Sequence, residues 1–273
     1  MHNKIYPCLW FNKNAMEAAT FYTSIFPNST ILSKNEMTVQ FTLLGSKIMG
    51  LNGGSMYSIN PAISFMIYCK NESDVDKFWA QLSENGTPLM DLNAYPWSKK
   101  YGWIKDKFGL TWQIMLHESI EQDITFHPSL LFVENQCGKA LHAIEYYTTI
   151  CANAKKISIE KYVENDSMPA GYLKYGLFSL FNYNFSAMDG IGNQTFFFNE
   201  AVSFVIECNN QDEIDYYWST LGRNGQPGMC GWLKDKFGIS WQILPTNLGN
   251  ILSNPATSKN AWLKLMKMKK III

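Results

Sequence analysis

The chain has 273 residues, of which 47% are hydrophobic and 17% are charged, and its 23 basic and 23 acidic side chains give a formal charge of zero. This composition supplies a sizeable core, suits two domains of ordinary size and excludes a disordered chain. The balanced charge argues against nucleic acid or an anionic membrane surface as a partner.

The cysteine and hydropathy patterns both favour a cytoplasmic protein. The six cysteines form no Cys-x-x-Cys pair and no Cys/His cluster with zinc spacing, as is usual for buried thiols in a reducing compartment. The N-terminus enters a strand pattern instead of a signal peptide, and no apolar run approaches the roughly 20 residues of a membrane span. We therefore expect a cytoplasmic location and no membrane partner.

The first part of the chain predicts a βαβββ unit. Residues 5–11 predict a strand, and residues 15–25 predict a helix whose apolar side chains recur at the i, i+3, i+4 and i+7 positions of one face. Residues 30–51 then predict further strands, with turn signals at 33–35 and 45–47.

The same order begins again at residue 62. Residues 62–69 predict a strand with few charges, and a helix follows that Ser73 or Asp74 caps. A polar loop with large rings spans residues 91–100, and a hairpin spans residues 101–115.

That hairpin shows that the chain is a duplication. Residues 101–115 appear again at residues 230–244, with ten of the fifteen positions identical. In both copies two strands flank a Lys-Asp-Lys-Phe-Gly turn, where Gly tolerates positive φ and turn chemistry explains Asp106 and Asp235.

The second half of the chain repeats the first. Residues 201–208 follow residues 62–69 at a shift of 139, which falls to 129 at the hairpin, so the second copy lacks ten residues of the aromatic loop. The repeats predict domains at residues 1–118 and 126–250, followed by a tail, residues 251–273, with a helix and a possible edge strand.

Several segments resemble one protein family over nearly the whole chain. They are Pro7 to Phe11, Ala15 to Tyr22, Ser64–Phe65, Tyr95 to Trp103, both Lys-Asp-Lys-Phe-Gly-x-x-Trp-Gln-Ile hairpins, and Met266 to Ile271. The chain resembles the 3-demethylubiquinone-9 3-methyltransferase-like (PhnB-like) family of the vicinal oxygen chelate superfamily. Glyoxalase I, bleomycin-resistance proteins and extradiol dioxygenases belong to that superfamily.

The resemblance implies an α+β fold. Four βαβββ units form two glyoxalase/bleomycin-resistance-like domains with curved mixed sheets, a cleft for a small-molecule ligand, and a homodimer. The sequence has no motif that corresponds to the methyltransferase activity in the family's name. No Gly-x-Gly-x-Gly loop follows a first strand, so we expect no S-adenosylmethionine site.

In that superfamily His, Gln or Glu side chains on first and last strands hold a divalent metal. Here Gln113 and Gln242 stand where glyoxalase-like members carry Glu, and a neutral amide is a poor substitute for a carboxylate. The first strands offer only Cys8 and its neighbour Pro7, or Pro128 and Ser129 in the second copy. We expect no cofactor and no metal, with a divalent metal as the alternative.

The resemblance places ten side chains at the ligand cleft: Cys8, Trp10, Ser64, Tyr95, Trp97, Trp103, Gln113, His127, Ser203 and Gln242. The glutamines either bond a ligand or cross-link strands, and most of the rings suit either stacking or the core. Tyr95 and Trp97 lie in a polar loop, where large rings need a cleft or a partner subunit to cover. His127 is either a cleft acid–base group or structural, and Cys8 has no basic neighbour in sequence to activate it.

These residues identify no catalytic group, and three hypotheses follow. The first is a small-molecule enzyme, or a degenerate relative of one, acting on a hydrophobic oxygen-bearing molecule without firm metal dependence. The second is a non-catalytic protein that sequesters an aromatic or drug-like compound, and the third is a structural or regulatory dimer with a vestigial cleft.

Overall fold

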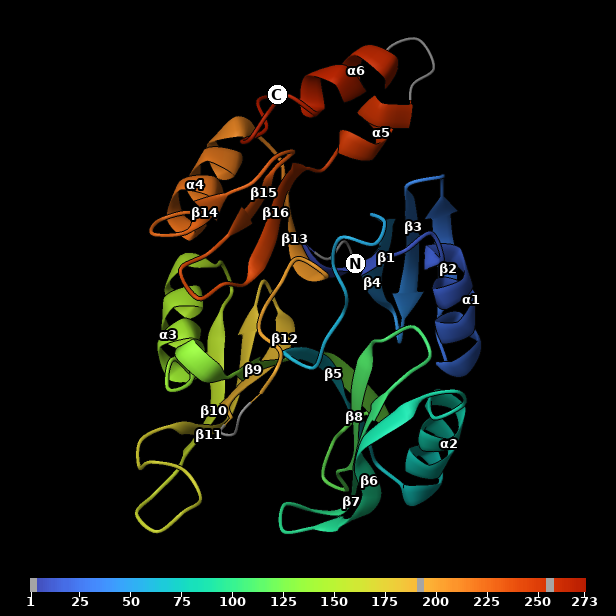
Figure 1. The fold of residues 1–273 in the computed structure, drawn as a ribbon, viewed down its shortest axis with the longest axis vertical. Coiled ribbons are helices and arrows are strands. Elements are labelled where there is room, and N and C mark those ends of the chain that lie inside the picture. Colours follow the sequence, from blue (N-terminus) through green and yellow to red (C-terminus); the bar gives the residue numbers. More distant parts are fainter. Residues whose placement is uncertain (1–3, 191–193, 254–257) are drawn as a thin grey trace.

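A computed structural model describes residues 4–190, 194–253 and 258–273. Over these residues the chain forms two eight-stranded mixed sheets, here named sheet A and sheet B, and six α-helices (Figure 1). The elements follow the order βαβββ four times, which confirms the α+β fold expected from the sequence.

Sheet A combines the first and the fourth βαβββ units. Its neighbouring strands are antiparallel except for the parallel pairs β13/β16 and β1/β4. In spatial order the strands are β14 (Gln226–Pro227), β15 (Trp232–Lys234), β16 (Ser240–Pro245), β13 (Val202–Cys208), β1 (Ile5–Phe11), β4 (Ser46–Asn52), β3 (Thr38–Leu43) and β2 (Thr30–Lys34).

Sheet B combines the second and the third units in the same way. Its parallel pairs are β12/β9 and β5/β8, and the two units join through the antiparallel pair β5/β9. In spatial order the strands are β10 (Lys155–Lys161), β11 (Leu173–Leu180), β12 (Tyr183–Asp189), β9 (Ile124–Phe132), β5 (Ile63–Cys69), β8 (Thr111–Leu116), β7 (Ser98–Lys105) and β6 (Thr87–Tyr95).

Each sheet therefore contains strands from both halves of the sequence. The segment between residues 118 and 126 separates the two sequence repeats, but it does not separate the two sheets. The sequence had left open whether units pair within one chain or between chains, and here they pair within one chain.

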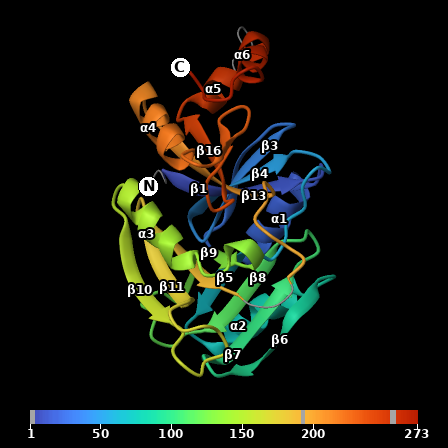
Figure 2. The same cartoon turned by 60° about the vertical axis from the view of Figure 1, so that its left-hand side comes forward.

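Helices α1 and α2 stack along one flank of the molecule, and α3 and α4 stack along the other (Figures 1 and 2). The helices and the 3-10 turn η1 have the bounds α1 (Ala15–Ile25), α2 (Glu72–Leu82), η1 (Glu134–Gln136), α3 (Ala140–Ile150), α4 (Gln211–Leu221), α5 (Leu248–Ser253) and α6 (Ser258–Leu265). One large apolar core lies between helices α1 to α4 and one face of each sheet, with Trp112 and Trp241 among its largest side chains.

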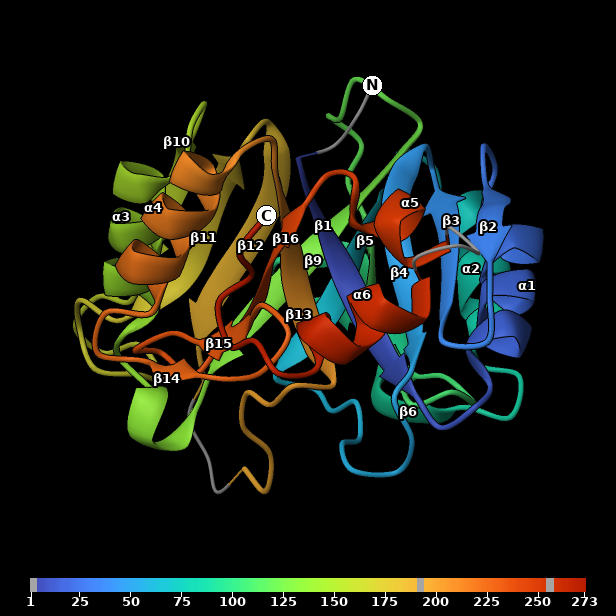
Figure 3. The ribbon, with the colours of Figure 1, turned by 90° about the horizontal axis from the view of Figure 1, so that it is seen from above.

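The opposite face of each sheet, which we name the inner face, carries the alternate side chains. In β1 the side chains of Ile5, Leu9 and Phe11 join the large core, whereas Tyr6 and Cys8 belong to a separate small cluster. This is the period of two that a strand imposes. Helices α5 and α6 lie above sheet A when the molecule is viewed from the top (Figure 3).

The two hairpin turns have the same geometry, and a buried carboxylate holds each of them in place. Asp106 Oδ2 accepts bonds from Tyr22 Oη and Trp112 Nε1, both at 2.8 Å. Its Oδ1 accepts from the backbone N–H groups of Phe108 and Leu110 at 2.8 and 3.1 Å. The turn therefore anchors helix α1 to sheet B, which is more than the turn chemistry inferred from the sequence.

Asp235 repeats this arrangement in the second copy. Tyr147 Oη and Trp241 Nε1 donate to Oδ2 at 2.6 and 2.8 Å, and the N–H groups of Phe237 and Ile239 donate to Oδ1. Burial raises the pKa of both aspartates, while the bonds they accept act in the opposite direction.

Three local expectations differ from the structure. The aromatic loop at 91–100 is mostly strand, since β6 and β7 leave only a tight connection between Tyr95 and Ser98. Asn71, instead of Ser73 or Asp74, caps α2 by accepting a bond from the N–H of Asp74. Residues 271–273 form no strand, because the chain there is irregular and Ile273 N bonds Gln211 Oε1.

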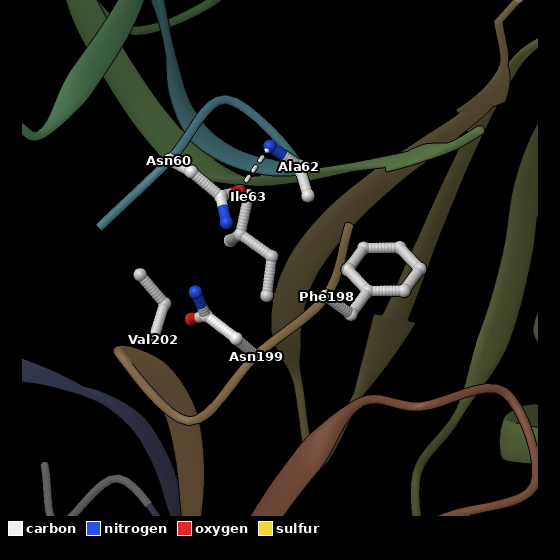
Figure 4. A pocket seen from close by; sticks show the side chains of 6 residues that line it. All are labelled: Asn60, Ala62, Ile63, Phe198, Asn199 and Val202. Atoms are coloured by element: carbon white, nitrogen blue, oxygen red, sulfur yellow. Dashed lines mark hydrogen bonds between the residues drawn. The ribbon is translucent and has the colours of Figure 1, made fainter. Parts of the chain in front are cut away.

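The connection between β4 and β5 contacts the segment that precedes β13, and Figure 4 shows one residue of each, Asn60 and Asn199, at the same small pocket. Asn60 Nδ2 donates to the carbonyl of Phe197, and Asn199 Nδ2 donates to the carbonyl of Ser58, both at 3.0 Å. The small hollow at this contact has no room for a water molecule.

Candidate functional site

The ten side chains expected at one cleft fall on two inner faces. Cys8, Trp10, Ser203 and Gln242 lie on strands of sheet A. The other six lie on sheet B or at its edge: Ser64, Tyr95, Trp97, Trp103, Gln113 and His127. Equivalent positions of the two copies thus form two separate, related sites.

At the centre of sheet A a glutamine and a serine bond to each other. Gln242 Nε2 donates to Ser203 Oγ at 3.0 Å, and both side chains are buried. Cys8 lies opposite Ser203 in the strand register, next to this pair. Burial raises the pKa of Cys8 to about 12, although Gln242 and Ser203 act to lower it. The thiol therefore stays protonated and is not a nucleophile at neutral pH.

Trp10 lies at one end of this face. Its indole N–H donates to the carbonyl of Gly54 at 2.7 Å, and its ring meets Tyr57 and Trp232 edge to face. A Cβ on Gly53 would lie 2.1 Å from the Trp10 ring, so this packing requires glycine.

A buried ion pair lies at the other end of the same face. Glu207 Oε1 accepts bonds from Tyr6 Oη at 2.7 Å and from Lys47 Nζ at 2.8 Å. The Lys47 ammonium also lies 4.1 Å from the centroid of the Tyr6 ring. Lys47 lies 160 residues before Glu207 in the chain, so this ion pair could not be read from neighbouring residues.

Sheet B has the same glutamine–serine pair with an added phenol. Gln113 Nε2 donates to Ser64 Oγ at 2.6 Å, and Gln113 Oε1 accepts from Tyr101 Oη at 2.8 Å. The orientation of the amide is therefore fixed by a donor and an acceptor. The sequence identified Gln113 and Ser64 but missed Tyr101, whose register position opposite Met115 could not be read from its neighbours.

Three rings cluster at the edge of sheet B. Tyr95 and Trp97 stack with centroids 5.1 Å apart, and both meet Tyr101 edge to face. Trp97 is 56% exposed. The cluster connects the exposed rim to the buried amide of Gln113.

His127 is buried on the same inner face. Only 3% of its surface is exposed, and burial lowers its pKa to about 3. Its ring lies 5.5 Å from that of Tyr68, whose hydroxyl bonds that of Tyr175 at 2.5 Å. A neutral imidazole in this setting can donate or accept a hydrogen bond, but it carries no charge at physiological pH.

We expect acid to destabilise the protein partly through His127. Because its pKa is depressed in the folded state, the unfolded chain binds the extra proton below pH 6.5, and stability falls as the pH falls toward 3. Between pH 7 and pH 5 the loss from this one group is about 2 kcal/mol. Urea unfolding at both pH values measures it.

The His127→Gln variant supplies the comparison, since glutamine is polar but does not titrate. Its free energy of unfolding should fall by about 2 kcal/mol less than that of the wild type over the same pH interval. Equal falls in the two proteins would show that His127 is protonated in the folded state.

The side chains of the inner faces do not match the donors that a divalent metal requires. The central positions carry a protonated thiol, serine hydroxyls and amides, none of which is a carboxylate, and His127 adds a neutral imidazole on sheet B. Glu207 is engaged by Lys47 and Tyr6. Over the described part of the chain, no three His, Cys, Asp or Glu side chains group closely enough to hold a metal.

The family model for 3-demethylubiquinone-9 3-methyltransferase matches residues 3–115 and again residues 124–244. The chain belongs to this family. The two matches correspond to the two sequence repeats, and they confirm the family resemblance noted in the sequence.

Solved structures show similarity at two levels. A putative 3-demethylubiquinone-9 3-methyltransferase, the PhnB protein of Bacillus cereus, is 35% identical over 40% of this chain and 96% of its own, with a TM-score of 0.39. Glyoxalase I of Zea mays is 10% identical over 97% of this chain and 95% of its own, with a TM-score of 0.56. The latter shows that this family member has the duplicated glyoxalase fold.

A search of curated proteins gives no match. Among the described helices none is both long and apolar enough to cross a membrane.

Proposed function

We propose that this protein binds a small hydrophobic, oxygen-bearing molecule on an inner face, without a divalent metal. The observation that carries the proposal is the glutamine–serine pair at the centre of each inner face, buried among aromatic and aliphatic side chains. A buried amide in such surroundings supplies directional hydrogen bonds to a ligand whose remaining contacts are apolar.

The donor set favours binding over activation of the ligand. No three His, Cys, Asp or Glu side chains group to hold a metal in the described part of the chain. Burial keeps the Cys8 thiol protonated and the His127 imidazole neutral. A metal-independent enzyme or a degenerate one remains compatible with the neutral His127 and the Tyr68–Tyr175 pair. Sequestration without chemistry is the alternative function.

The proposal is tested by a thermal-shift screen against quinones, glutathione adducts and S-adenosylmethionine, with metal analysis of protein purified without chelators. We expect a rise in Tm with quinone-like molecules, none with S-adenosylmethionine, and no stoichiometric Zn, Ni, Mn or Fe. A bound metal in stoichiometric amount, or a shift only with S-adenosylmethionine, would contradict the proposal.

Trp97 should influence binding more than folding. The Trp97→Ala variant removes a ring that is 56% exposed, so we expect a Tm close to that of the wild type but weaker binding of a ligand or of a second subunit. Thermal unfolding and a titration with the best ligand from the screen check both parts.

The matched control for Trp97 is Phe197→Ala, which removes another exposed ring, 64% exposed, away from Tyr95 and Tyr101. It should change neither Tm nor binding. Loss of soluble protein on the Trp97 change would instead assign that ring to the core.

The expected homodimer and cytoplasmic location also stay predictions, and light scattering of the purified chain tests the first.

A further inference from the structure

The two inner faces can be compared position by position because the units are related by duplication. In sheet A the strand register places Trp232 opposite Gln242, Cys8 opposite Ser203, and Met49 beside Cys8. In sheet B the same register places Trp103 opposite Gln113, Ser129 opposite Ser64, and Ser186 beside Ser129. The serines of sheet B at the last two positions thus correspond to a cysteine and a methionine in sheet A.

The inner face of sheet A is satisfied by its own side chains. Cys8, Met49, Tyr6 and Val205 pack as one apolar cluster, with Leu51 and Leu244 against it. The indole N–H of Trp10 and the carboxylate of Glu207 both have partners within the chain.

The C-terminal segment also approaches this face. Its Ile271 side chain and that of Leu244 both come within about 3 Å of the place where a Cβ on Gly231 would lie. The backbone N–H groups of Cys230 and Gly231 donate to the carbonyls of Met268 and Lys269. Helices α5 and α6 lie above the same sheet (Figure 3).

The inner face of sheet B differs because several of its buried polar atoms have no hydrogen-bond partner among the described residues. Four of them lie on β7, β8 and β9, namely Trp103 Nε1, Thr111 Oγ1, His127 Nε2 and Ser129 Oγ, and a fifth, Ser186 Oγ, lies on β12. Thr111, His127 and Ser129 are at most 3% exposed. Folded proteins rarely leave such atoms unpaired, because each loses its bonds to water on burial.

These atoms lie on adjacent strands. Strands β7, β8, β5 and β9 are neighbours in sheet B, and at the usual spacing between strands they span about 14 Å. That span is wider than a molecule with two fused rings and leaves room for a hydrogen bond at each of its ends. The atoms gather around the fixed amide of Gln113, at one end of the stacked rings of Tyr95 and Trp97.

Resting on the proposed function, we infer that the ligand binds to the inner face of sheet B and not of sheet A, and that it is a neutral planar aromatic molecule with both carbonyl and hydroxyl oxygens. The indole N–H of Trp103 is solely a donor and requires an acceptor such as a carbonyl oxygen. Ser129 and neutral His127 can each serve a hydroxyl group. Trp103, Thr111, Ser129 and the neutral His127 carry no charge, so these groups offer an ionised ligand no counter-charge.

A fluorescent probe of this class, 7-hydroxycoumarin, tests the inference at pH 6.5, with naphthalene and 2-naphthoate as comparison molecules. Fluorescence titration should show one site per chain for the coumarin and much weaker binding of both comparison molecules. Trp103→Phe and Ser129→Ala should each weaken coumarin binding about fivefold, the effect of one lost hydrogen bond. Ser129→Ala should not lower Tm, since the hydroxyl it removes has no partner in the chain.

The matched controls are the equivalent changes in sheet A, Trp232→Phe and Cys8→Ala, which should leave the affinity unchanged. If these two weaken binding while the sheet B variants do not, or if two sites per chain appear, the choice of sheet B is wrong and the proposed function stands. Binding of naphthalene or 2-naphthoate as tightly as the coumarin overturns the ligand class. If the coumarin does not bind, this inference fails. If in addition no quinone-like molecule raises Tm, the proposed function fails with it.

Discussion

The Asp106→Ala variant is expected to lose about 4 kcal/mol of its free energy of unfolding, a large part of what an ordinary domain possesses. Asp106 is 3% exposed and accepts four hydrogen bonds, from two side chains and two backbone N–H groups. Each donor left unpaired inside the protein costs roughly 1–3 kcal/mol, less where water can enter. Urea unfolding at pH 7, followed by circular dichroism, measures the difference.

The reason for this large effect is the position of the carboxylate between two elements. Tyr22 lies on α1, whereas Trp112 lies on β8 of sheet B, 90 residues later in the chain. Without Asp106 the hairpin turn loses its shape and the helix loses its attachment at the same time. The two contributions share one side chain, so they disappear together.

The duplication provides an internal control, because Asp235→Ala removes the same four bonds in the second copy and should have a similar effect. Tyr22→Phe removes one donor and leaves the other three in place, so it should cost only about 1 kcal/mol. An Asp106→Ala protein within about 1 kcal/mol of the wild type would show that water replaces the carboxylate.

Much of the fold can be predicted from the sequence because its signals are local and occur twice. The period of apolar residues in α1 and the Lys-Asp-Lys-Phe-Gly turns are properties of short segments, and the repeat at residues 230–244 confirms their reading. The pairing of units is not local. Strands β5 and β13 are both buried on two faces, and nothing within them states which first strand each one joins.

In the candidate site, too, local features can be predicted from the sequence, whereas long-range pairs cannot. The type and strand position of Gln113 and Ser64 were readable, but their mutual bond depends on a parallel register that the sequence does not encode locally. From the sequence alone Asp106 is interpreted as a turn residue, because its partner Tyr22 lies 84 residues away. Long-range pairs of this kind are invisible to periodicity, although an unexplained charge such as Glu207 on a buried strand is a signal that a distant partner exists.

The Lys47→Met variant is expected to lose about 3 kcal/mol of its free energy of unfolding at pH 7. The side chain of Glu207 is 8% exposed, and Lys47 Nζ lies 2.8 Å from its Oε1. Methionine preserves much of the volume of lysine but removes the ammonium group that donates to Glu207 Oε1 inside the protein, while the bond from Tyr6 is kept. Denaturant unfolding measures the loss.

The double variant Lys47→Met, Glu207→Gln separates the charge from the packing. A glutamine still offers an oxygen to Tyr6 Oη, but it is neutral, so the double variant should recover about 2 kcal/mol of the loss. Lys99→Met breaks an ion pair with Glu118 in which both side chains are more than half exposed, and it should leave stability unchanged. If the double variant is no more stable than Lys47→Met, the loss comes from the contact between Lys47 and the Tyr6 ring and not from the broken ion pair with Glu207.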